Sequence, residues 1–229
     1  MRLARVLVLV ALAAAPAACD GDGEDSAAEP TTPAATATET SGSDVSGGCT
    51  RADAPEPKQN GGKKPPEDEL EEGTTYRLQV ETNCGSFTIT LDQELAPRTA
   101  ASLVSLAESG FFDGTTFHRV VPGFVIQGGD PTGTGTGGPG YQTVDTPPSD
   151  ARYTRGVVAM AKAGFEAPGT SGSQFFVVTG DDVGLPPDYA IVGEVTDGFD
   201  AVRAIDRLGV ADGPPSQPVV IERVTVSEH

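Results

Sequence analysis

The sequence has few of the residues that most catalytic centres use. It contains two histidines, His118 and the C-terminal His229, and three cysteines. A serine- or cysteine-type triad would therefore depend on His118 alone. No cysteine and histidine have the spacing of metal ligands. We therefore expect no metal and no cofactor.

Basic residues are also scarce. There are 15 Lys and Arg against 33 Asp and Glu, a net charge of −18. Residues 20–72 hold 14 acids and 4 bases, and residues 73–229 hold 19 acids and 9 bases, so each part has a net charge of −10. No basic stripe occurs, which argues against nucleic acid as a partner. The acidic surface argues equally against direct adhesion to anionic lipid.

No apolar run is long enough to span a bilayer comfortably. The first 18 residues have Arg2 and Arg5, an apolar stretch over 6–15, and small residues before Cys19. This is the layout of a secretory signal peptide, 1–18. The residues before Cys19 resemble a bacterial lipoprotein signal, with proline where that pattern prefers leucine, so we expect a lipid on Cys19. The alternative is an ordinary cleaved signal and a secreted protein.

Residues 19–73 are rich in Ala, Thr, Ser, Gly, Pro and acid, without periodic apolar residues. Such a segment cannot bury enough surface to offset the cost of ordering, so we predict a disordered linker. Cys49 lies in it and Cys84 lies in the following region. In an oxidising compartment the pair suggests a disulfide, whereas the alternative is a buried Cys84 and a free Cys49.

From residue 74 the pattern changes to that of one folded domain, 74–229. Residues 76–81 and 86–91 alternate apolar and polar as strands of a hairpin, and 219–226 alternate as a closing strand. Pro97 and Gly110 bracket one helix, and 199–208 form a second. Short β-like pieces lie at 117–121, 124–127, 156–161, 175–178 and 190–195. We predict a mainly β domain, a closed or nearly closed antiparallel barrel capped by two helices.

Two segments carry unusual residues. In Phe117–Asp130, alternation predicts Arg119 on the same side as Phe117 and Val121, where a cation needs partners. The second runs from Met160 to Ala163 and resumes at Ser171–Phe176. Gly133–Gly138 formally fits a G-x-G-x-x-G pattern, but Pro139 and Gly140 follow, so no helix can begin there to bind phosphate.

Both segments resemble the cyclophilin signature, over roughly residues 74–229. The resemblance implies an eight-stranded closed barrel, two helices and a proline-binding groove. It implies that Arg119 and Gln127 are catalytic, Gln127 together with Gln174 positioning the substrate and the arginine. The remaining groove positions that it implies are Phe124, Val125, Ala161, Lys162, Gln174, Phe176, Leu185 and Tyr189. Here Lys162 replaces a common asparagine, and Gly184 and Tyr189 replace tryptophan and histidine, which argues against strong cyclosporin binding.

The resemblance predicts a peptidyl-prolyl cis–trans isomerase that acts on Xaa-Pro segments. The lipoprotein-like start predicts that these segments belong to exported or envelope proteins. We expect a monomer that meets the membrane only through its lipid. Two alternatives keep the same fold: a non-catalytic module that binds proline-containing segments of an envelope partner, and a tethered scaffold whose groove is filled by the chain's own proline-rich linker.

Overall fold

The computed structural model describes residues 45–46 and 48–229. The predicted signal peptide and Cys19 lie outside the described residues. The helices are α1 (Pro97–Glu108) and α2 (Phe199–Asp206). The strands are β1 (Val45–Ser46), β2 (Cys49–Thr50), β3 (Tyr76–Thr82), β4 (Gly85–Leu91), β5 (Thr115–Thr116), β6 (Arg119–Val121), β7 (Val125–Gly128), β8 (Thr143–Val144), β9 (Val157–Met160), β10 (Thr170–Ser171), β11 (Phe175–Val178), β12 (Ile191–Asp197) and β13 (Val220–Glu228).

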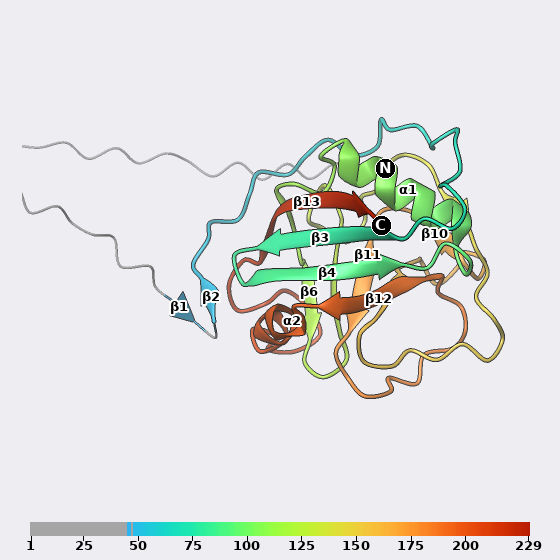
Figure 1. The fold of residues 1–229 in the computed structure, drawn as a ribbon. Coiled ribbons are helices and arrows are strands. Elements are labelled where there is room, and N and C mark those ends of the chain that lie inside the picture. Colours follow the sequence, from blue (N-terminus) through green and yellow to red (C-terminus); the bar gives the residue numbers. More distant parts are fainter. Residues whose placement is uncertain (1–44, 47) are drawn as a thin grey trace, which may run out of the picture. The chain divides into compact units, whose positions relative to one another are not determined.

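Nine of these strands form one antiparallel sheet in the order β5-β13-β3-β4-β12-β9-β11-β7-β6 (Figure 1). The predicted hairpin is present as β3 and β4, with Leu78 opposite Ile89. The two end strands of the sheet, β5 and β6, follow each other in the chain with only Phe117 and His118 between them. The first of them, β5, pairs with β13 at one end of the sheet, and the second, β6, pairs with β7 at the other end.

The prediction of a closed eight-stranded barrel is wrong in strand number and in closure. The sheet has nine strands and curls without continuous pairing between its ends. Only an isolated bridge, Thr116 to Asp130, links β5 to the residues after β7. The reason is that one stretch of chain, 115–121, is divided into two short strands that pair with different neighbours.

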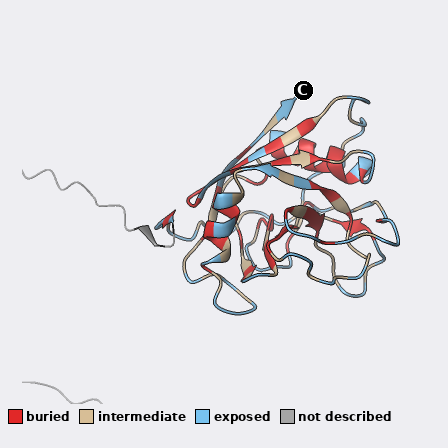
Figure 2. Cartoon of the chain, turned by 60° about the horizontal axis from the view of Figure 1, so that its bottom comes forward, coloured by how far each residue is buried: buried red, intermediate tan, exposed pale blue. Residues whose placement is uncertain are grey.

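The main core fills the concave side of the sheet. Strands contribute alternate residues to it, among them Leu78, Phe87, Met160, Phe175 and Val192, because successive side chains point to opposite faces. α2 buries one side in this core, as Figure 2 shows by colour, whereas α1 is buried over most of its surface, including all of Thr99–Val104. α1 begins at Pro97, where the missing N–H costs no hydrogen bond. α2 ends two residues earlier than the sequence predicts.

The structure departs from the expected disordered linker over residues 48–73. Cys49 is fully buried and is joined to Cys84 by a disulfide with an S–S distance of 2.05 Å. Backbone bonds attach Thr50 to Asn83, and Lys58 to Pro131. Composition could not reveal these bonds, because they join polar backbone groups to a surface that forms only in the folded domain. In the described residues no helix is long and apolar enough to cross a membrane.

Candidate active site on the outer face of the sheet

The candidate site lies on the convex side of strands β9, β11, β7 and β6. Alternation along β11 sends Phe175 and Val177 into the main core, and Phe176 and Val178 into a second buried cluster. The same rule on β7 sends Ile126 inward and leaves Gln127 on the outer face. β11 is buried on both faces for this reason.

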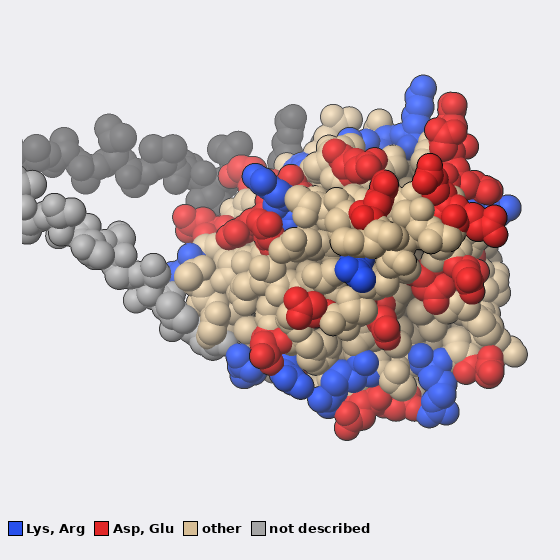
Figure 3. Space-filling model, viewed as in Figure 1, with Lys and Arg blue, Asp and Glu red and all other residues tan. Residues whose placement is uncertain are grey.

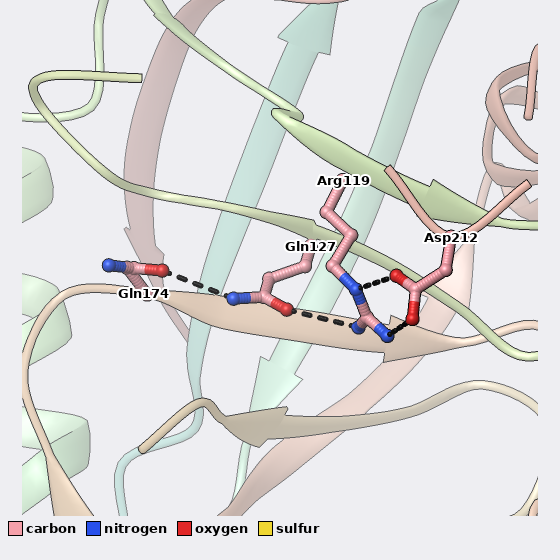
Figure 4. A network of polar contacts seen from close by, with 4 residues as sticks. All are labelled: Arg119, Gln127, Gln174 and Asp212. Atoms are coloured by element: carbon pink, nitrogen blue, oxygen red, sulfur yellow. Dashed lines mark hydrogen bonds and ion pairs between the residues drawn. The ribbon is translucent and has the colours of Figure 1, made fainter. Parts of the chain in front are cut away.

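Arg119 is the cation of this outer face. It lies opposite Gln127 in the β6–β7 ladder, and its Nη1 donates to Gln127 Oε1 at 3.3 Å. Gln127 Nε2 donates to Gln174 Oε1 at 3.1 Å, and Gln174 Nε2 donates to the Gly137 carbonyl at 2.9 Å. Figure 4 shows this row of side chains. The amides thus fix the guanidinium on one side.

The predicted position of Phe117 beside Arg119 is wrong. Phe117 is fully buried in the main core, whereas Arg119 is on the outer face with its side chain 30 % exposed. The alternation fails because Phe117 lies between β5 and β6, outside either strand. The aromatic ring beside Arg119 is instead that of Phe124, whose centroid lies 5.9 Å from the guanidinium carbon.

An apolar cluster, which we call the slot, adjoins the guanidinium through Phe124. Its base consists of Val125 and Phe176, 2 % and 4 % exposed. Partly buried side chains pack around them, including those of Phe124, Ala161, Leu185 and Tyr189. The Phe176 and Tyr189 rings meet edge to face at 5.6 Å between centroids. The structure therefore brings the predicted apolar residues together in one cluster.

Lys162 lies at the edge of the slot. Its ammonium is 5.6 Å from the centre of the Tyr189 ring and donates to the Glu166 carbonyl at 3.1 Å. The neighbouring Ala161 N–H donates to the Gln174 carbonyl at 2.9 Å, which ties this edge to the amide row.

Two residues that contact the site were missed by the sequence analysis. Asp212 accepts from Arg119 Nε at 2.5 Å and from Nη2 at 3.1 Å. Tyr153 is 1 % exposed beneath the slot, and its hydroxyl donates to the Tyr189 carbonyl at 2.7 Å and accepts from the Tyr189 N–H at 3.0 Å. Neither lies within the signature segments, so no spacing or pattern marked them.

The positive charge of Arg119 is paired with the carboxylate of Asp212. The hydrogen bond from Arg119 lowers the pKa of Asp212 below its usual value, so this carboxylate is ionised near neutrality. Burial lowers the pKa of His118, next to Arg119 in the chain, which favours the neutral imidazole. Figure 3 looks onto the side of the molecule with β3, β4 and β12, where Asp and Glu are spread widely and several Lys and Arg lie along the lower edge. In the described part of the chain, no group of three His, Cys, Asp or Glu is placed to hold a metal ion.

Comparison with known proteins agrees with this geometry. The model of the cyclophilin-type peptidyl-prolyl cis–trans isomerase family matches residues 77–226. Peptidyl-prolyl cis–trans isomerase A of Mycobacterium tuberculosis is 42 % identical over 173 residues, 67 % of this chain and 93 % of that protein. The probable isomerase A of Mycobacterium leprae is 41 % identical over 168 residues, 65 % of this chain and 90 % of that protein.

Solved structures show the same likeness. A cyclophilin-type isomerase of Cryptosporidium parvum superposes with a TM-score of 0.62 and 30 % identity, covering 68 % of this chain and 99 % of that one. The same protein crystallised in the presence of the dipeptide Ala-Pro gives a TM-score of 0.61 and 31 % identity, over 67 % of this chain and 99 % of that one. The curled sheet is thus cyclophilin-like. The chain belongs to the cyclophilin-type peptidyl-prolyl cis–trans isomerase family, and its activity is the cis–trans isomerisation of prolyl peptide bonds.

Proposed function

We propose that Arg119 catalyses isomerisation by donating a hydrogen bond to the prolyl nitrogen as the peptide bond twists. A prolyl bond resists rotation because amide conjugation creates a barrier of about 20 kcal/mol. Rotation breaks the conjugation and leaves a lone pair on nitrogen. A guanidinium does not lose its proton near neutrality, so it can only donate, and a fixed donor stabilises that lone pair in the transition state.

The hydrogen-bond pattern of Arg119 supports this role. Its guanidinium has five N–H groups, of which three are used, two by Asp212 and one by Gln127. One N–H on each terminal nitrogen is left for substrate, while the other bonds hold the plane of the group. This is the observation that carries the proposal: a held, partly exposed cation with donors to spare beside an apolar slot.

The slot contributes by removing water. A proline ring seated on Val125 and Phe176 would exclude solvent from the amide, and water favours the planar, polarised form. Gln127 would orient both Arg119 and the peptide through the amide row. The proposed mechanism uses no covalent intermediate and no proton transfer.

The test is the isomerisation rate of a proline tetrapeptide with the purified full chain. Arg119→Ala should lower kcat/KM about a hundredfold, the effect of losing one preorganised donor worth about 3 kcal/mol. Arg119→Lys should recover little, because an ammonium lacks the planar fork. Arg223→Ala, an exposed arginine on β13, is the matched control and should match wild type. Equal rates for Arg119→Ala and wild type would defeat the proposal.

We further propose that the clients are proteins that fold after export, and that a lipid on Cys19 holds the enzyme at the cell envelope. The signal-like residues 1–18 support this, as does the Cys49–Cys84 disulfide, since disulfides persist in oxidising compartments. Labelling with radioactive palmitate in a lipoprotein-processing bacterium tests it. Wild type should carry label and pellet with membranes, and Cys19→Ala should do neither; label on the variant would contradict the assignment.

A further inference from the structure

A segment before the matched family residues is bound to the domain. We call residues 49–63 the strap; they precede the family match at 77–226 (Figure 1). One end is fixed by the Cys49–Cys84 disulfide. Beside it, the Asn83 side chain donates to the Thr50 carbonyl at 2.7 Å, and the Thr50 N–H donates to the Asn83 carbonyl at 2.8 Å.

Lys58 anchors the middle of the strap. Its ammonium donates to the carbonyls of Gly110, Phe111 and Asp113 at 3.1, 2.7 and 2.9 Å. These carbonyls follow the C-terminus of α1, where a cation is favourable. Burial lowers the pKa of Lys58, and the nearby Asp113 charge opposes that shift. All three ammonium hydrogens thus have a partner, which fixes where the strap crosses the domain.

The far end of the strap pairs with the glycine-rich loop 131–140. The Gly61 N–H donates to the Gly138 carbonyl at 2.9 Å, and the Gly138 N–H donates to Asn60 Oδ1 at 2.9 Å. A Cβ on Gly140 would lie 2.9 Å from the Gly62 nitrogen, so the two backbones are too close for a larger residue.

This loop is a wall of a cavity that adjoins the apolar cluster at Ala161. The cavity has a volume of about 740 Å³, and Asn60 lines it together with Gln127, Gln174 and Ala161. Gly137, next to the residue that Asn60 holds, accepts the hydrogen bond from Gln174. The strap is therefore one peptide unit away from the amide row of the active site.

We propose that the strap is part of the substrate groove, and that Asn60 is a positioning and specificity-determining residue for peptides extending beyond the proline slot. Asn60 Oδ1 holds Gly138, and the Asn60 side chain closes one side of the cavity. The Arg119 side chain is held directly by Asp212 and Gln127, which belong to the domain and not to the strap. We therefore expect the strap to affect KM for long peptides, whereas kcat depends on Arg119 and the residues that hold it.

The experiment compares Asn60→Ala with wild type in the full chain. One probe is a ten-residue peptide with a central Ala-Pro bond and polar residues on both sides; the other is the dipeptide Ala-Pro, which can fill only the slot. For the ten-residue peptide, KM should rise about fivefold, the effect of one net hydrogen bond, with kcat within about twofold. The Kd of Ala-Pro should not change.

Lys58→Met should also raise KM for the ten-residue peptide, because it removes the bonds that anchor the middle of the strap. Lys64 is an exposed lysine just beyond the strap, and Lys64→Met is the matched control. An unchanged KM in both Asn60→Ala and Lys58→Met overturns the proposal. The proposal is also overturned if KM for the ten-residue peptide and Kd for Ala-Pro rise by the same factor while Tm falls. That result would indicate only a structural role for the strap. The inference rests on the proposed catalysis, but Arg119→Ala tests that separately.

Discussion

The glycine-rich loop depends on one buried carboxylate. Asp130 is fully buried, and its Oδ1 accepts from the N–H and hydroxyl of Thr132 at 2.7 and 2.9 Å. Its Oδ2 accepts from the N–H groups of Thr134, Gly135 and Gly137 at 3.1, 2.6 and 3.2 Å. Burial raises the pKa of Asp130, but these hydrogen bonds outweigh it, and the net shift is downward.

Asp130→Asn should therefore be strongly destabilising. An asparagine keeps one acceptor oxygen and places an NH₂ group where the other stood. At least one backbone N–H then loses its acceptor and faces another donor, and the bonds that remain are made to a neutral group. Hydrogen bonds to charged groups are worth about 1.5–3 kcal/mol each, and part of that is recovered by water in an opened loop, so we expect a loss of about 2–4 kcal/mol. For a domain of this size that lowers Tm by about 5–12 °C.

Thermal unfolding followed by circular dichroism measures the effect, with Asp181→Asn as control because the Asp181 side chain is 92 % exposed. The pH dependence has a definite sign. A carboxyl whose folded pKa is depressed stabilises the protein above its unfolded pKa of about 4, and the contribution is lost as the pH falls through the lowered folded pKa. The variant should lack this acid-side loss. A Tm equal to that of the control would refute the reasoning.

Two further predictions concern Arg119 and the strap. Asp212→Ala removes two of the three hydrogen bonds that hold the Arg119 side chain. In peptide kinetics kcat should fall about threefold with KM nearly constant, because an exposed ion pair contributes little beyond orientation. A larger change in KM than in kcat would contradict this. Cys49→Ser with Cys84→Ser opens a link between residues 35 apart and should cost about 3 kcal/mol in urea unfolding; an unchanged midpoint would count against a structural disulfide.

Local pattern was enough to predict several elements. The alternation over 76–91, Pro97 at the start of α1 and the closing strand all appear near the expected bounds. These features depend on neighbours in the chain. The resemblance also identified residues that share the outer face, because strand periodicity and the signature fix which side each faces.

Sequence alone failed where distant segments meet. Asp212 reaches Arg119 across 93 positions. The strap binds the domain through Cys49, Lys58, Asn60 and backbone groups, and their partners lie far away in the chain. The sheet is open between β5 and β6 because residues 115–121 form two short strands with different neighbours, which an uninterrupted alternation would not predict. Composition predicted disorder for residues 48–73 because it counts apolar side chains and cannot count hydrogen bonds to a surface formed elsewhere.

The most direct test of the account is the cis–trans exchange rate of a bound Ala-Pro peptide, measured by NMR at saturating enzyme. This measurement isolates rotation on the enzyme from binding and release. Wild type and Arg119→Ala should bind the peptide with similar Kd, and the exchange rate on the variant should be about a hundredfold lower. Equal exchange rates on the two enzymes would show that the guanidinium does not assist the rotation.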